Sequence, residues 1–328
     1  MRIYVIGDKN QELENMNSGR NEVIYTSIFS AIFTTLFNRG SIIYSEKENS
    51  ILDVLQKIFK LPYLYGKLES ILEFENHYAK IKKYEIPVLM YHQFVNEKSE
   101  GGKIKLFVTK KQFELHLKIL KWLNYETITF EDLEKIGLQN RFYKKYIILT
   151  VDDGYKDNYT ILYPMLKKYN MKAVIFLVSG LDYNRWTVES DNEKRFDLMS
   201  DEEVMELQNS GHIEFGGHTL THVSFFDVDD ERAREEIVKD KEITEKRLGK
   251  KLKVFAYPYG HKRKEVVEMV KKCGYSFAVS TDTGSGIFTK DLFDIRRTAI
   301  DKTSLINFLR RISPRYLQYK ARKYKDKF

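Results

Sequence analysis

Short apolar runs alternate with segments of helical periodicity from about residue 86 onward. Continuous apolar runs of four to seven residues are typical of strands buried on both faces of a parallel sheet. Strands are predicted over Val88–Tyr91, Tyr146–Val151, Ala173–Val178, Ile213–Phe215, Val254–Tyr257, Phe277–Ser280 and Ile295–Ile300. Helices are predicted over Lys111–Leu123, Tyr159–Tyr169, Glu231–Leu248 and Lys264–Cys273, and a capping box of Ser200 and Glu203 opens another. The alternation predicts an α/β fold, either a parallel sheet or a β/α barrel.

Residues 1–85 show no such alternation, and we predict a separate N-terminal region of unknown role. A helical pattern covers Ser50–Lys60. The longest apolar-leaning stretch, Val23–Phe37, is too short to span a bilayer comfortably and carries several Ser and Thr residues. A buried helix is our prediction for this stretch, and an interfacial membrane helix is the alternative.

Composition and charge narrow the class of protein. The chain has 328 residues, of which 42% are hydrophobic and 31% charged, as in soluble globular proteins. Cys273 is the only cysteine, which excludes an internal disulfide. The net charge is +8, and residues 310–328 hold eight Lys or Arg against one acid. The rest of the chain is therefore close to neutral, which argues against a nucleic-acid surface.

The basic tail, residues 313–328, has two interpretations. It is either a peripheral contact with an anionic membrane surface or a solvated, frayed terminus. The first twenty residues contain no apolar stretch long enough for a signal peptide. We therefore expect a cytoplasmic protein without a transmembrane helix, at the inner face of the cytoplasmic membrane if the tail binds lipid. The oligomeric state is not predicted.

Candidate chemistry lies where the predicted strands end. The sequence LTVDDGY places Asp152 and Asp153 directly after a buried strand, where a solvated turn is the simplest interpretation. The sequence GGHTLTH follows another strand and holds His218 and His222. If this segment makes a helical turn, both imidazoles face one point. Two imidazoles and a carboxylate form the ligand set of an open divalent-metal site, which favours a metal centre over a turn.

A metal would also explain the adjacent carboxylates. One of the two can bind the cation, and the cation offsets the cost of keeping the other charged. The second is then free to accept a proton from a water that the metal activates. A third strand end reads FAYPYG, where Pro258 fixes the backbone and the N–H of Tyr259 is a candidate oxyanion donor. An ordinary loop is the alternative.

The motifs TVDDG, GGHTLTH and FAYPYG, in this order, resemble the metal-dependent polysaccharide deacetylases, also known as the NodB homology domain or carbohydrate esterase family 4. The resemblance covers about residues 86–312. It implies a distorted (β/α) barrel of about seven strands that hydrolyses an N-acetyl or O-acetyl group of a sugar. It further implies Asp152 as general base and a metal, zinc or else cobalt or nickel, held by Asp153, His218 and His222.

The sequence departs from the family pattern in two places. Most members carry an arginine three residues before the motif proline, and here that position is Phe255. Most also carry a late histidine as general acid, whereas no histidine follows His261. The poly-N-acetylglucosamine deacetylase branch, which the chain also resembles, begins its domain with a strand ending in Tyr-His. The resemblance therefore suggests His92 as the acid, with a structural strand-end histidine as the alternative.

The same branch has an arginine on its late strand. By that resemblance Arg297 replaces the missing arginine, with Arg296 as the rival. Three aromatic or loop residues are predicted to contact substrate: Trp186, Tyr257 and Pro258. Simple packing of the loop is the alternative for Trp186.

We expect an acetylated carbohydrate as the partner, a glycan or glycolipid precursor. Two other functions stay open. A glycosyltransferase could use the aspartate pair for a metal-bound nucleotide sugar, although the histidines would then be unexplained. The missing motif arginine would also fit an inactive carbohydrate-binding module.

Overall fold

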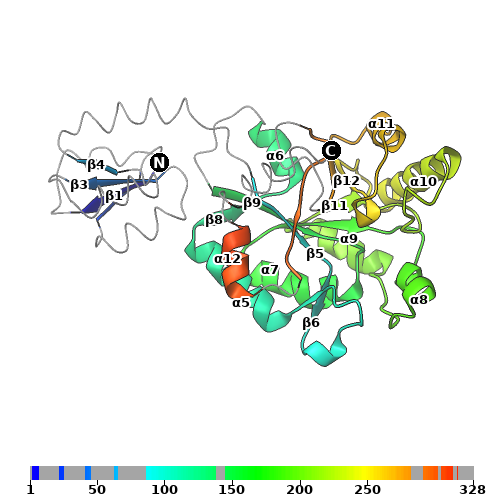
Figure 1. The fold of residues 1–328 in the computed structure, drawn as a ribbon, viewed down its shortest axis with the longest axis horizontal. Helices are drawn as coiled ribbons and strands as arrows, with labels where there is room; N and C mark the ends of the chain where they lie inside the picture. Colours follow the sequence, from blue (N-terminus) through cyan, green and yellow to red (C-terminus); the bar gives the residue numbers. More distant parts are fainter. Residues whose placement is uncertain are drawn as a thin grey trace. The chain divides into compact units, whose positions relative to one another are not determined.

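The computed structural model describes residues 2–6, 22–25, 41–45, 63–65, 86–137, 145–281, 291–301, 304–312 and 316. The chain divides into two compact units (Figure 1). The first comprises Met1–Tyr84, Leu120–Glu126 and Gln139–Lys145. The second comprises Glu85–Ile119, Thr127–Leu138 and Tyr146–Phe328. Most of the basic tail lies outside the described residues.

The first unit contains a four-stranded parallel sheet of order β2-β1-β3-β4. Its strands are β1 (Arg2–Ile6), β2 (Glu22–Tyr25), β3 (Ser41–Ser45) and β4 (Tyr63–Tyr65). The helix predicted over Val23–Phe37 is therefore wrong at its start, where the β-branched and aromatic residues Val23–Tyr25 belong to a strand. The remainder of that stretch and the Ser50–Lys60 pattern lie outside the described residues.

The second unit is built on a mostly parallel sheet that curls into a half-barrel of seven strands, which confirms the predicted fold. The order is β13-β12-β11-β10-β9-β5-β14, and β8 pairs with β9 outside this path. The strands are β5 (Val88–Tyr91), β8 (Tyr125–Thr127), β9 (Lys145–Val151), β10 (Ala173–Leu177), β11 (Ile213–Gly217), β12 (Val254–Ala256), β13 (Phe277–Val279) and β14 (Thr298–Ala299). A short parallel pair, β6 (Gln93–Val95) and β7 (Phe107–Thr109), follows β5.

Helices connect the strands (Figure 1). They are α5 (Lys110–Trp122), α6 (Phe130–Ile136), α7 (Tyr163–Tyr169), α8 (Arg185–Asp191), α9 (Asp201–Asn209), α10 (Asp230–Leu248), α11 (Lys264–Lys272) and α12 (Leu305–Arg311). The capping box of Ser200 and Glu203 opens α9 as predicted, and Gly249 ends α10 in the left-handed conformation. The helix predicted from Tyr159 starts as a π-helical turn, Asn158–Leu162, before α7. Within the described part of the chain, no helix has the length and apolarity needed to cross a bilayer.

Burial explains why the strands could be predicted from apolar runs. Every residue of β5, β10, β12 and β13 is buried, as expected for strands covered on both faces. The structure contains all seven predicted strands. The closeness of β11 to its neighbours depends on glycine, because a Cβ added at Gly216 would lie 2.6 Å from the Phe176 ring and 2.7 Å from the Val254 carbonyl.

The segment Ile295–Ala299 joins the two ends of the curled sheet. Ile295 forms a parallel bridge with Val279 of β13, and β14 pairs with β5 at the opposite end. The strand predicted over Ile295–Ile300 is consequently reduced to Thr298–Ala299, because the chain changes partners between its two halves. Arg297 lies at this crossing, where its side chain can reach the end of the central strand β9.

Candidate active site

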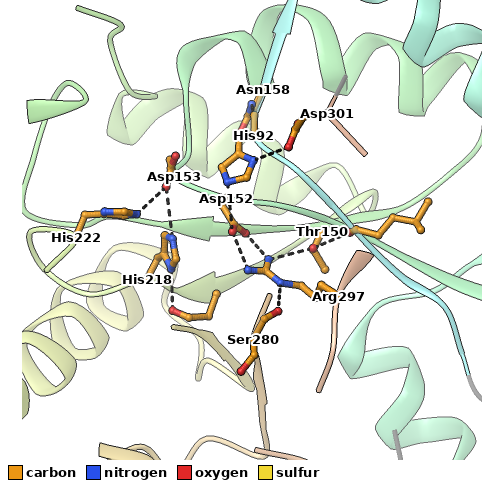
Figure 2. A network of polar contacts seen from close by, with 12 residues as sticks. His92, Thr150, Asp152, Asp153, Asn158, His218, His222, Ser280, Arg297 and Asp301 are labelled. Carbon is orange, nitrogen blue, oxygen red and sulfur yellow. Dashed lines mark hydrogen bonds and ion pairs between the residues drawn. The ribbon is translucent and has the colours of Figure 1, made fainter. Parts of the chain in front are cut away.

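Polar side chains from separate strands meet at the carboxyl end of the sheet, as expected for a parallel α/β architecture (Figure 2). His92 follows β5, the two aspartates follow β9, and His218 follows β11. Arg297 precedes β14 and points to the same place. Two groups of contacts result, one around Asp153 and one around Asp152.

The first group consists of Asp153, His218 and His222, all buried. Each offers one ligand atom, and these atoms lie within 4.8 Å of one another. Nε2 of His218 is 3.4 Å and Nε2 of His222 is 3.3 Å from Asp153 Oδ1. The imidazoles do converge, although the segment does not make the helical turn that was considered as a way to bring them together. The segment instead reverses through left-handed backbone at Thr219 (φ 70°) and at His222 itself (φ 59°).

The chemistry of these three side chains fits a divalent cation. His218 Nδ1 lies 2.7 Å from the Ala256 carbonyl, which can only accept a hydrogen bond. In the neutral ring the proton is therefore on Nδ1, and the lone pair of Nε2 faces the Asp153 oxygen. These two electron-rich atoms, Nε2 of His218 and Oδ1 of Asp153, repel each other when no cation is bound. A cation bound by both would turn this repulsion into attraction. A donor set of two imidazoles and one carboxylate suits zinc, cobalt or nickel.

The charge states of the group agree with ligation. Burial raises the pKa of Asp153, but the two imidazoles outweigh it and hold that pKa well below its usual range. Burial lowers the pKa of His222. The Asp153 carboxylate raises the same pKa, but the effect of burial is larger. An ionised carboxylate beside a neutral imidazole is the state that binds a metal.

The second group is a buried ion pair between Asp152 and Arg297 (Figure 2). The guanidinium donates to both carboxylate oxygens, with Nη1–Oδ1 of 2.5 Å and Nη2–Oδ2 of 2.8 Å. It also donates to the Ser280 carbonyl at 2.9 Å and to Thr150 Oγ1 at 3.2 Å. Burial raises the pKa of Asp152, yet the Arg297 charge outweighs it and keeps that pKa below its ordinary value. Between the two candidates for the missing arginine, Arg297 is the one placed on Asp152.

His92 lies between two carboxylates. Its Nε2 is 3.8 Å from Asp152 Oδ2, and its Nδ1 is 3.6 Å from Asp301 Oδ2. Asn158 donates to the His92 carbonyl at 3.1 Å and helps to hold the backbone. Burial lowers the pKa of His92, but the carboxylates of Asp301, Asp152 and Asp153 raise it to about 9. His92 is therefore the protonated partner of an ionised Asp152 at neutral pH.

Sequence reasoning missed Asp301. It follows the predicted strand Ile295–Ile300 directly, in the same position relative to its strand as Asp152 has relative to β9. An acid at the end of a late strand was therefore a signal that could have been used.

Residues of both groups line one cavity of about 370 Å³, and Arg297 is not among them. Its polar wall is formed by His92, Asp152, Asp153, His218 and His222. The remainder of the lining includes Ile104, Leu106, Tyr155, Trp186, Phe196 and Tyr259. A buried carboxylate–imidazole cluster facing an apolar and aromatic wall is the arrangement expected of a small-molecule or sugar site.

The predicted substrate contacts have different outcomes. Trp186 lines the cavity and stacks on His222, with 4.4 Å between ring centroids and 21° between planes. Tyr257 is fully buried, and its hydroxyl donates to the Phe293 carbonyl at 3.1 Å. Neither Tyr257 nor Pro258 lines the cavity, so substrate contact through these side chains is not supported. Tyr259 does line it, with left-handed backbone (φ 57°). The oxyanion role of its N–H stays a prediction.

The loops that form the apolar wall are joined by a carboxylate that sequence reasoning also missed. Glu193 accepts hydrogen bonds from the backbone N–H groups of Lys103 (2.9 Å) and Ile104 (2.7 Å). Lys103 Nζ in turn donates to the Asn192 carbonyl at 2.9 Å. Segments about ninety residues apart in sequence are thereby held together beside Trp186.

Comparison with known proteins identifies the class that this fold and site define. Residues 139–278 match the family model described as polysaccharide deacetylase. The chain is 28% identical over 220 residues to Bacillus subtilis YxkH, covering 67% of this chain and 72% of that protein. It is 28% identical over 221 residues to the poly-beta-1,6-N-acetyl-D-glucosamine N-deacetylase of Staphylococcus aureus, covering 62% and 74%.

A solved structure of a polysaccharide deacetylase from Bacillus cereus is similar with a TM-score of 0.57 and 29% identity, covering 70% of this chain and 69% of that one. The curled parallel sheet and the Asp-His-His cluster at its carboxyl end thus belong to a region that resembles polysaccharide deacetylases. Residues 139–278 are similar to polysaccharide deacetylase domains in both sequence and fold. The resemblance noted in the sequence is confirmed.

Proposed function

We propose that the protein removes the acetyl group from N-acetylated sugar units of a glycan or glycan precursor, with zinc or another divalent cation at Asp153, His218 and His222. The observation that carries the proposal is the arrangement beside the ligand triad, where His92 and Asp152 line the same cavity and the buried Arg297 binds Asp152. The Staphylococcus aureus relative, by its name, acts on poly-β-1,6-N-acetyl-D-glucosamine. This name supports an N-acetylglucosamine unit as substrate.

The roles of the side chains follow from their charge and position. A cation held by Asp153, His218 and His222 would supply Lewis-acid activation of a water and of the acyl carbonyl. Asp152 is ionised and held in place by Arg297, so it accepts the proton of the attacking water. As the oxygen of the water bonds to the carbonyl carbon, the N–H of Tyr259 stabilises the charge developing on the carbonyl oxygen. His92 then donates its proton to the nitrogen, the C–N bond breaks, and acetate and a free amine result.

The buried Arg297 also answers the objection raised by Phe255. The family arginine is absent from the FAYPYG motif, but a guanidinium still binds Asp152 through both oxygens. The base therefore retains the partner that an inactive module would lack. This geometry favours an active enzyme over a carbohydrate-binding module.

Measuring two products tests the proposal. The purified chain is incubated with N-acetylglucosamine oligomers and Zn²⁺, and acetate and primary amines are both quantified. We expect them in equal amounts. Acetate without amine would indicate an O-acetyl substrate instead. No acetate from any acetylated glycan, with oligomer binding retained, would support the inactive module.

Arg297→Lys should lower activity and move its acid limit to higher pH. Lysine keeps the charge but cannot bind both oxygens of Asp152, so the base is held less firmly and its pKa rises. Because only the ionised base functions, activity then disappears at a higher pH as the solution is acidified. We expect kcat to fall by about 10- to 100-fold. The pH–rate profile is the measurement, and an unchanged acid limb would contradict the role of Arg297.

Asp301→Asn should move the alkaline limit of activity to lower pH. The carboxylates of Asp301, Asp152 and Asp153 face His92 and together raise its pKa to about 9. Activity that needs a protonated His92 is present below that pKa and is lost above it. Removing the Asp301 carboxylate lowers the pKa of His92. The positive charge of a cation at Asp153 would lower the same pKa further. The profile of Asp301→Asn is compared with that of the parent in the same metal buffer. An alkaline limb at the same pH would show that His92 is not the acid or that Asp301 does not act on it.

A further inference from the structure

The loop that carries two of the three candidate metal ligands has strained backbone. Residues 218–222, here called the ligand loop, begin where β11 ends and contain both His218 and His222. Thr219 and His222 are in the left-handed conformation, with φ of 70° and 59°. For a β-branched residue such as Thr219 this conformation is an outlier, and it persists only where the surrounding structure imposes it. The groups that impose it therefore help to determine the geometry of the site.

Glu236 of α10 holds the ligand loop through three hydrogen bonds. Its Oε2 accepts from the N–H of Thr221 at 2.8 Å, and its Oε1 accepts from the Thr221 hydroxyl at 2.6 Å. Its main-chain carbonyl accepts from the N–H of Leu220 at 3.2 Å. Glu236 is fully buried, and Thr221 comes immediately before His222 in the chain. One residue of the helix thus fixes the backbone between the two histidines.

The segment that follows β10 holds the same loop through its carbonyl groups. The N–H of Gly180 donates to the Leu220 carbonyl at 2.8 Å, and the N–H of Ser179 donates to the Thr219 carbonyl at 3.4 Å. These hydrogen bonds, like those of Glu236, use no imidazole and no atom of Asp153. The shape of the ligand loop is consequently maintained by contacts that do not depend on a cation.

The buried face of α10 is polar where an apolar stripe would be expected. Glu236, Asp240 and Thr244 follow one another at intervals of one helical turn, and all three are fully buried. Asp240 lies against the end of β11, because a Cβ added at Gly217 would be 2.6 Å from its Oδ2. Glu236 is paired with Arg232 at 2.5 Å. Apolar residues of similar size are often at least as stabilising as a buried ion pair, so stability alone does not explain a carboxylate at position 236.

We propose that Glu236 is a positioning residue that keeps the ligand loop in its metal-binding shape before the cation binds. By holding Thr221, it fixes the backbone that carries the His222 ring and so the approach of that ring to Asp153. In its absence the cation would have to order the loop as well as bind to it, and metal affinity would be lower. This inference rests on the proposed function, because it takes the cation to be held by Asp153, His218 and His222.

The zinc affinity of the purified chain tests the proposal without turnover. The dissociation constant of Zn²⁺ is measured by competition with a chromophoric chelator for the parent, Glu236→Gln and Thr221→Val. Glutamine has a single acceptor oxygen and loses one of the two side-chain hydrogen bonds, whereas valine removes the hydroxyl and keeps the shape of threonine. We expect each variant to bind zinc about 10-fold more weakly, as is usual when an outer partner of a metal ligand is lost. Thr221→Ser, which keeps the hydroxyl, should bind zinc as the parent does.

Thr244→Val is the matched control. It makes the same change of side chain at another fully buried position of α10, two turns beyond Glu236, and should leave zinc affinity unchanged. Thermal unfolding of every variant is recorded with and without zinc. A purely structural role would destabilise the two forms equally and leave the dissociation constant of zinc as in the parent. That result for both Glu236→Gln and Thr221→Val, or an equal loss of affinity in Thr244→Val, would overturn the proposal.

Hydrogen exchange in the metal-free chain tests the same role where no cation takes part. The N–H of Thr221 donates to the Glu236 carboxylate, so it should exchange slowly in the metal-free parent and about 10-fold faster in Glu236→Gln. Equal exchange in the two chains would also overturn the positioning role, while leaving the deacetylase intact. A parent that binds no zinc at all would instead contradict the metal centre, and with it the proposed function on which this inference rests.

Discussion

Asp152→Asn should lower kcat by about 10²- to 10⁴-fold, the usual contribution of a general base. Asparagine has nearly the same shape but cannot accept the proton of the attacking water. The variant should still bind the metal, because Asp153, His218 and His222 are unchanged. Acetate release at saturating substrate, together with the metal content per chain, is the measurement. A variant as active as the parent would exclude Asp152 as the base.

The same substitution should also destabilise the fold. Asparagine leaves the Arg297 guanidinium buried without its counter-charge, and breaking a buried pair typically costs about 3–5 kcal/mol. Thermal unfolding measures the loss of stability. Activity is measured well below the unfolding temperature, so that the loss of catalysis is not caused by unfolding. Glu214→Gln is a matched control, because Glu214 is a buried carboxyl near the opposite end of β11. Burial raises the pKa of Glu214 to about 8, so this change replaces one neutral group with another at pH 7.

His218→Ala should abolish both metal binding and activity. The substitution removes one of three protein ligands, so metal affinity should fall by more than the roughly 10- to 100-fold that loss of an outer partner costs. Zinc content after dialysis against a metal buffer is measured beside acetate release. His212→Gln is the control, since His212 lies before β11 and its Nδ1 contacts the Met171 carbonyl at 2.8 Å. Retention of one zinc per chain by His218→Ala would show that the cation lies elsewhere or is not held by this triad.

The sequence was most informative where chemistry follows an apolar strand. Asp152, Asp153 and His218 each come directly after such a strand, and parallel strands bring their carboxyl ends together. Their proximity could therefore be predicted without knowledge of any distance. His222 could be predicted only from its spacing of four residues from His218. The left-handed backbone at Thr219 and His222, which brings the two rings together, cannot be recognised from the pattern of apolar residues.

Partners distant in sequence were harder to predict. The contact of Arg297 with Asp152 joins residues 145 positions apart. It was inferred only by resemblance, since either of two adjacent arginines could have turned inward. Glu193 binds backbone groups of another segment, and nothing in its local sequence indicates this. Tyr257 shows the converse: an aromatic residue in a functional motif was expected at the substrate but is used for packing.

The N-terminal sheet was missed for another reason. Its strands are short and separated by segments of mixed composition, so no period of two or of 3.6 is sustained long enough to be recognised. Four parallel strands require connections that cross over the sheet, and the pairing between distant strands is not encoded locally. The role of this unit therefore could not be inferred from its pattern.

Removal and return of the metal tests the central claim most directly. The purified chain is treated with a chelator, freed of it by dialysis, and assayed for acetate release from an N-acetylglucosamine oligomer before and after one equivalent of Zn²⁺ is added. We expect activity to disappear with the metal and to return with a single zinc per chain, and we expect no return in His218→Ala. Undiminished acetate release from chain shown to contain no metal would contradict the account.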